Sequence, residues 1–166
     1  LAQALVERGI AAEDAGAPEQ ALQCYREALE ADAGFAPAHM NLGIALQARG
    51  ETAQAIQAHL RAIELDAHYA AAHYNLGRAL LESAQAGQAE TAFRNALRLR
   101  AQFPEAWVGL ADALEALGRD DEALVCLQNA IDQREQNVGA LFNASVLLRK
   151  LGRFDDAQAR LDQIDL

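Results

Sequence analysis

The side chains best suited to catalysis or metal binding in this sequence are four histidines and two cysteines, and their spacing supports neither. No two of the histidines (His39, His59, His68 and His73) are four residues apart, the interval that places two ligands on one helix face. Cys24 and Cys126 form neither a CxxC pair nor a zinc-binding spacing. The sequence also lacks the GxSxG, Walker and dinucleotide-binding fingerprints. We therefore expect no metal, no cofactor and no enzymatic activity.

Charge and hydropathy exclude two further classes of partner. The sequence has 24 acidic residues against 14 basic ones, which gives a net charge of −10, whereas nucleic-acid-binding proteins carry basic patches. No run of 18 apolar residues occurs, so we expect no direct membrane insertion. The two unpaired cysteines favour a cytoplasmic location.

A more informative set of residues recurs every 34 positions. Units that start at Ala2, Ala36, Ala70, Pro104 and Val138 carry an alanine at the same position in all five cases, namely Ala21, Ala55, Ala89, Ala123 and Ala157. Four residues later the side chain is large in every unit: Tyr25, His59, Phe93, Leu127 and Leu161. Small side chains at fixed positions let helix axes approach closely, and large ones fill the space around that contact.

Each unit has the pattern of two helices separated by a turn. The first helix is predicted to end at a residue that is glycine in four units, because glycine adopts φ > 0 readily, and Ala84 in the third. The second helix begins about three residues later. One such hairpin cannot bury its apolar face alone, so we expect the units to stack. The sequence therefore predicts an all-α solenoid, a single domain over residues 1–166 with repeats 2–35, 36–69, 70–103, 104–137 and 138–166.

This pattern resembles the tetratricopeptide repeat (TPR) family. The third unit shows the resemblance best, with His73, Leu76, Gly77, Leu80, Ala89, Phe93 and Ala96 at the positions of the family pattern. The resemblance implies a right-handed superhelix whose first helices line a concave peptide-binding groove. The sequence departs from the family where a proline is replaced, at Ala33, Ala67, Ala101 and Glu135, and at Arg8, where leucine is usual. We therefore expect looser turns and a less well packed first unit.

Helical spacing assigns a set of side chains to the open face of the first helices, the predicted groove. Its members are Val6, Met40, Asn41, Ile44, Tyr74, Asn75, Arg78, Val108, Asp112, Phe142 and Asn143. The apolar members other than Ile44 share one position of the repeat, and they either pack on a neighbouring hairpin or receive side chains of a partner. The amides of the three asparagines offer a donor and an acceptor to a peptide backbone, and they resemble the asparagine ladder of O-linked N-acetylglucosamine transferase repeats.

The expected function is that of a non-catalytic scaffold that binds a peptide segment of a protein partner. The alternative is the substrate-recruitment arm of a larger enzyme, such as a bacterial O-linked N-acetylglucosamine transferase-like glycosyltransferase. A carboxylate clamp of the kind found in some chaperone-binding TPR domains is not expected, because the positions that need bases carry residues such as Val6, Ala71 and Asn75.

The last predicted helix has no successor in the sequence to cover it. It carries Phe154, Ala157, Leu161, Ile164 and Leu166. The end of a solenoid needs a polar outer face or a capping helix. Either the protein continues beyond this sequence, or two chains associate through the uncapped C-terminal repeat.

Overall fold

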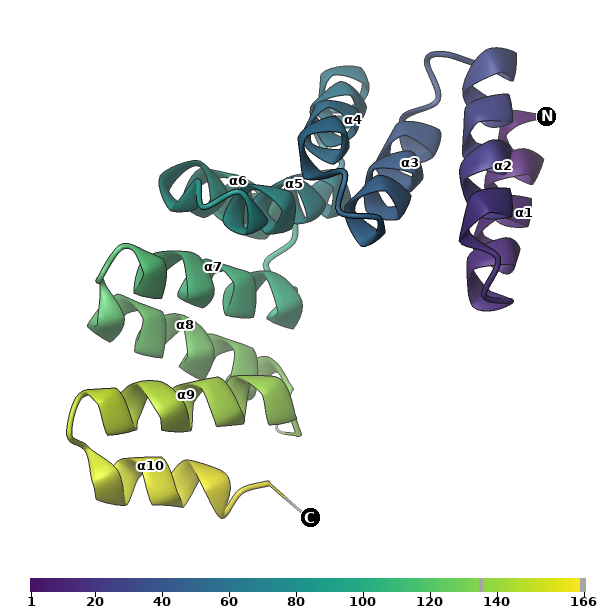
Figure 1. The fold of residues 1–166 in the computed structure, drawn as a ribbon. Coiled ribbons are helices and arrows are strands. Elements are labelled where there is room, and N and C mark those ends of the chain that lie inside the picture. Colours follow the sequence, from purple (N-terminus) through teal and green to yellow (C-terminus); the bar gives the residue numbers. More distant parts are fainter. Residues whose placement is uncertain (135, 165–166) are drawn as a thin grey trace. The chain divides into compact units, whose positions relative to one another are not determined.

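The computed structural model describes residues 1–134 and 136–164, which form ten α-helices and no strand (Figure 1). The first helices of the hairpins are α1 (Ala2–Asp14), α3 (Ala36–Ala48), α5 (Ala70–Glu82), α7 (Pro104–Ala116) and α9 (Val138–Lys150). The second helices are α2 (Pro18–Ala31), α4 (Thr52–Leu65), α6 (Ala86–Leu99), α8 (Asp120–Gln133) and α10 (Phe154–Leu161). The predicted all-α solenoid class is confirmed. Glu135 and Leu166, named in the sequence predictions, lie outside the described residues.

The chain divides into two compact units. The N-terminal unit, residues 1–85, contains the hairpins α1–α2 and α3–α4 together with α5, and its first helices contact one another in chain order. The C-terminal unit begins at Ala86 and contains α6 followed by the hairpins α7–α8 and α9–α10, in which each helix contacts the next (Figure 1). The assignment of both units to one solenoid domain stays a prediction.

The recurring alanines are buried in the packed interior. Each has a relative exposure of 1% or less, and the large side chain four residues later is also buried in the first four units. A Cβ atom added to Gly43 would lie 2.5 Å from the Cε1 atom of His59, and one added to Gly9 would overlap the Tyr25 ring in the same way. Glycine at positions 9 and 43 therefore leaves the space that the ring of the second helix fills.

The turn inside each hairpin needs a left-handed residue. Gly16, Gly50, Gly118 and Gly152 have φ between 73° and 77°, and Ala84 takes the same place with φ of 56°. An L-residue pays roughly 1–2 kcal/mol for this conformation because its Cβ approaches the carbonyl oxygen. Ala84 is thus the one strained turn residue in the described part of the chain.

Ala84→Gly is expected to stabilise the N-terminal unit by about 1 kcal/mol, since glycine adopts this φ without a steric penalty. Urea unfolding followed by circular dichroism would show a raised midpoint. Ala11→Gly is the matched control, because Ala11 is an exposed residue inside α1, where glycine should cost about 0.5–1 kcal/mol. A lowered midpoint for both variants would contradict the assignment of strain to Ala84.

The last helix is shorter than the sequence pattern predicted. The other second helices have 14 residues, whereas α10 has 8 and ends at Leu161. Ile164 therefore follows the helix, and its N–H bonds to the Leu161 carbonyl oxygen at 3.0 Å. Most helical stability in proteins comes from packing of an apolar face, and no later hairpin packs on α10 in the described residues.

Candidate functional site

In the N-terminal unit, the predicted groove residues differ in how much they are exposed. Val6 is only 3% exposed and belongs to the apolar core, so at this position the packing alternative is favoured over contact with a partner. Met40, Ile44 and Tyr74 are half-buried, and Arg78 is exposed. The Arg78 guanidinium lies 6.0 Å from the centroid of the Tyr74 ring, within range of a cation–π contact. The accessible part of this face therefore lies on α3 and α5.

The two asparagines of this unit bond to their own helices. The Asn41 Nδ2 donates to the Pro37 carbonyl oxygen at 2.8 Å, and the Asn75 Nδ2 donates to that of Ala71 at 2.9 Å. Asn41 is half-buried and Asn75 is buried. One N–H of each amide is used in this way, while these bonds leave the second N–H and the amide oxygen for another partner.

The C-terminal unit has a more open apolar face, on α9. Val138, Phe142 and Val146 stand four residues apart and are 50%, 55% and 48% exposed, so they form one stripe along the helix. We call these three residues the α9 stripe. Val108 on α7 is half-buried. Sequence reasoning selected Phe142 but missed Val138 and Val146, although their spacing of four residues is a readable signal.

A carboxylate lies beside this stripe. The Asn143 Nδ2 donates to the Asp112 Oδ1 at 3.3 Å and so links α9 to α7. The Asp112 side chain retains solvent access, but the surrounding protein desolvates its carboxylate and raises its pKa to about 6, with a smaller contribution from the negative charge of Glu115. The C-terminal face therefore combines an apolar stripe with an acid that titrates at mildly acidic pH.

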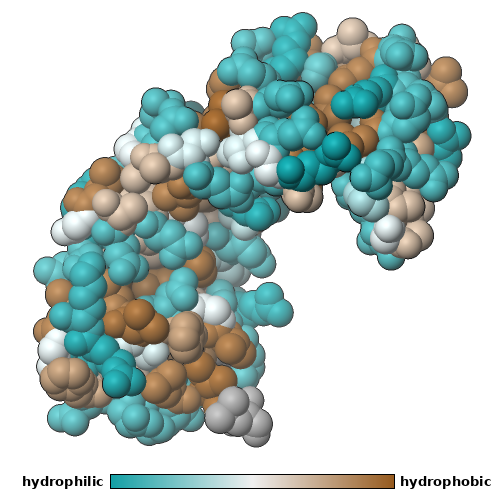
Figure 2. All heavy atoms as spheres, viewed as in Figure 1, coloured by the Kyte–Doolittle hydropathy of each residue, from teal (hydrophilic) through white to brown (hydrophobic). Residues whose placement is uncertain are grey.

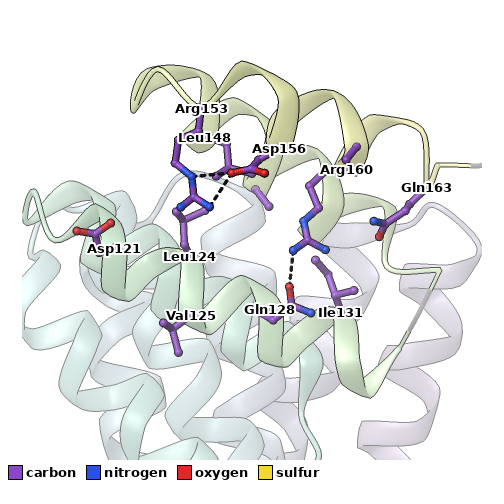
Figure 3. A pocket seen from close by; sticks show the side chains of 12 residues that line it. Asp121, Leu124, Val125, Gln128, Ile131, Leu148, Arg153, Asp156, Arg160 and Gln163 are labelled. Atoms are coloured by element: carbon purple, nitrogen blue, oxygen red, sulfur yellow. Dashed lines mark hydrogen bonds and ion pairs between the residues drawn. The ribbon is translucent and has the colours of Figure 1, made fainter.

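The second helices of the C-terminal unit, α8 and α10, have a depression between them (Figure 3). It holds about 610 Å³, and its floor includes Ile131, Ala144 and Leu148. Ala144 occupies the repeat position of Leu42, Leu76 and Leu110, so a smaller side chain deepens the groove. On its rim Arg153 pairs with Asp156 at 2.7 Å, and the Arg160 Nη2 donates to the Gln128 Oε1 at 2.6 Å. We call this depression the outer groove. Figure 2 shows apolar atoms exposed over the C-terminal unit in patches separated by hydrophilic side chains.

His59, His73 and both cysteines lie in the packed interior. Within residues 1–134 and 136–164, no three His, Cys, Asp or Glu side chains are grouped to hold a metal ion, and no helix is long and apolar enough to cross a membrane. Both cysteines are buried free thiols, and burial raises the pKa of Cys126 to about 11. His59 is fully buried, and neither ring nitrogen has a partner in the described part of the chain. Its burial, and next the charge of Arg78, lower its pKa to about 4.

Four segments that together span most of the sequence match family models. Residues 2–35, 74–138 and 138–163 match models described as tetratricopeptide repeat, and residues 45–83 match one described as TPR repeat. The chain is a tetratricopeptide repeat protein. No curated protein sequence matches that of this TPR protein.

Several solved structures share the fold of this TPR protein. MamA from Desulfovibrio magneticus RS-1 superposes with a TM-score of 0.86 at 17% identity, over 98% of this chain and 92% of that one. PilF from Pseudomonas aeruginosa gives 0.90 at 21% identity over 98% and 74%. YrrB, described as a TPR protein with an unusual peptide-binding site, gives 0.75 at 23% identity over 96% and 82%. At these identities the likeness shows the fold alone.

The loops that have alanine in place of the usual TPR proline are held by hydrogen bonds from ring nitrogens of histidine and tryptophan side chains. A ring on the following helix reaches back to a loop carbonyl in three units: His39 Nε2 to Ala33 at 3.0 Å, His73 Nε2 to Ala67 at 3.1 Å, and Trp107 Nε1 to Ala101 at 3.4 Å. The histidines make this bond when Nε2 carries the proton. We expected these turns to be loose because proline is missing. Instead, each of the three loops is held to the following helix by a hydrogen bond.

Proposed function

We propose that this TPR protein binds a peptide segment of a partner protein on the exposed face of its first helices. TPR proteins are protein-interaction scaffolds, and the proposal concerns which face is used. The observation that supports it is the α9 stripe, in which three large apolar side chains are each about half exposed on one helix face. Contiguous exposed apolar surface on a soluble protein marks interaction sites.

The chemistry of this face suggests what it would bind. Apolar side chains of a peptide would bury against Phe142 and Val146, while the backbone would exchange hydrogen bonds with the Asn143 amide. Asp112 adds a negative charge beside the stripe, so a lysine or arginine in the peptide fits better than an acid. In the N-terminal unit, Met40, Asn41 and Ile44 offer a similar combination of apolar and amide groups on α3.

The alternative of a recruitment arm for a larger enzyme rests on the asparagines. Asn41 and Asn75 occupy equivalent positions one repeat apart and make the same intrahelical bond. This regularity fits an amide ladder, although Gly109 interrupts the series. The alternative uses the same face and stays a prediction.

Phe142→Ala is expected to weaken peptide binding by about tenfold or more, because a central aromatic contributes more than 1 kcal/mol at an interface. Peptides would be selected from a phage-displayed random library on the 166-residue chain, and the affinity of each would be measured by fluorescence anisotropy. Phe154→Ala is the matched control, since Phe154 is 65% exposed on α10 and lies outside this face. Equal affinities for wild type and Phe142→Ala would refute the proposed face.

A further inference from the structure

The outer groove of the C-terminal unit has a counterpart in the N-terminal unit. There a depression of about 420 Å³ lies between α2 and α4, and its lining includes Leu29, Leu42 and Leu46. These three residues hold the repeat positions of Ile131, Ala144 and Leu148, which line the outer groove. Both depressions are therefore the same feature of the repeat, formed where two successive second helices flank a first helix.

Two substitutions distinguish the outer groove from this counterpart. On the floor, Ala144 stands where the N-terminal groove has Leu42. On α10, Arg160 holds the repeat position of Ala58, which is alanine or cysteine in every earlier unit. The arginine side chain does not fill the space left by the smaller floor residue, since the outer groove holds about 610 Å³ against about 420 Å³. The outer groove thus has added room next to apolar side chains, and a positive charge.

The charge of Arg160 is not neutralised within the groove. Its Nη2 donates to the Oε1 of Gln128, a neutral amide, at 2.6 Å, and no carboxylate in the described part of the chain pairs with it. Arg153, which also lines the groove, pairs with Asp156 at 2.7 Å. Arg160 is half-buried, so the protein shields it from part of the solvent. A carboxylate that entered the groove would therefore gain a charge-assisted hydrogen bond.

The outer groove is long enough for several residues of a peptide. Asp121 and Ile131 both line it and are ten residues apart on α8, which corresponds to about 15 Å along a helix. An extended peptide rises about 3.3 Å per residue, so a segment of about five residues fits this length. Leu124 and Val125 line the stretch between, and Asp121 lies at the opposite end from Arg160 (Figure 3). An acid in the peptide is thus attracted at one end and repelled at the other.

We propose that the outer groove binds a short peptide segment of a partner protein that combines a large apolar side chain with a nearby aspartate or glutamate. The apolar side chain fills the space over Ala144, against Leu148 and Val125, and the carboxylate pairs with Arg160. This site lies between second helices, whereas the proposed function uses the exposed face of the first helices. The two sites can therefore hold different segments.

Peptides selected from a phage-displayed random library test this inference. The selection uses the Phe142→Ala variant of the 166-residue chain, so that peptides bound to the first-helix face are depleted. We expect the selected sequences to contain a leucine or an aromatic residue together with an acid. Their affinities for each variant would be measured by fluorescence anisotropy with labelled synthetic peptides.

Two variants remove the two features of the groove separately. Ala144→Leu restores the residue that three other units have at this position and should weaken binding by about tenfold or more, because leucine occupies the space that the peptide fills. Arg160→Gln removes the charge and should also weaken binding by about tenfold. Arg149→Gln is the matched control, since it removes an exposed positive charge outside the outer groove, and it should bind like the parent chain.

Circular dichroism and thermal unfolding separate a lost contact from a lost fold. If Ala144→Leu lowers the melting midpoint, Arg160→Gln decides, because it changes a side chain that is only half-buried. Arg160→Glu should reject the selected acidic peptides and bind versions in which the acid is replaced by lysine. The inference is overturned if no peptide is selected, if the selected peptides lack acids, or if Ala144→Leu and Arg160→Gln bind them as tightly as the parent chain.

Discussion

His59→Phe is expected to remove most of the acid sensitivity of the N-terminal unit. In the folded chain the His59 pKa is about 4 against an ordinary value of 6.5, because the buried ring is desolvated and Arg78 repels its charged form. The folded state therefore favours neutral histidine. Its contribution to stability is complete above pH 6.5, falls as the pH drops toward 4, and changes no further below that.

The size of this effect follows from linkage. One pKa unit corresponds to about 1.4 kcal/mol, so His59 should cost the wild type about 2 kcal/mol between pH 7.5 and pH 5. Phenylalanine occupies the equivalent position 93, which shows that the repeat accommodates a ring without ring nitrogens. The variant should also be more stable at neutral pH, since no buried nitrogen is left without a partner.

Urea unfolding at pH 7.5 and pH 5 would measure the difference. His68→Phe is the control, because it removes a histidine that is exposed in a turn. Carboxylates contribute equally to wild type and variant, so the comparison isolates His59. An unchanged pH dependence in His59→Phe would show that this ring is protonated without cost in the folded chain.

Ala123→Leu is expected to destabilise the C-terminal unit by about 1–3 kcal/mol or more. Ala123 on α8 is 0% exposed and sits at the position that is alanine in all five repeats. Three further carbon atoms there must push α8 away from its neighbour or force side chains off their rotamers. Thermal unfolding followed by circular dichroism should show a lowered midpoint.

Val125→Leu on the same helix supplies the comparison. Val125 is 62% exposed, so one added methylene should change stability by less than about 0.5 kcal/mol. Equal melting midpoints for Ala123→Leu and the wild type would mean that the recurring alanines do not mark the close helix contacts.

The repeat period predicted the helices because it records packing that recurs in every unit. An alanine that recurs at one repeat position, followed by a large residue four positions later, predicts both the hairpin and its buried interior, as at Ala55 and His59. The end of α10 was not predictable in this way. Up to Leu161 the pattern matches the earlier units, but the length of a helix depends on its tertiary packing, which the repeat period does not record.

The candidate face was predicted less well, for a different reason. An apolar residue at a given position looks the same in sequence whether it packs or faces solvent, so Val6 and Phe142 were grouped together although one is 3% and the other 55% exposed. Val138 was missed because the same position holds alanine in three other units. The outer groove depends on Ala144 replacing leucine, a change whose meaning appears only when the neighbouring helices are in place.

The strain at Ala84 can be relieved by a single base change in the gene. Every alanine codon becomes a glycine codon through one base change at its second position. One point mutation is therefore enough to change Ala84 to glycine, the residue that the other four hairpins have in this turn. Natural proteins are rarely at their stability optimum. A laboratory selection of this gene for thermal resistance should reach that codon early, before changes that need two substitutions.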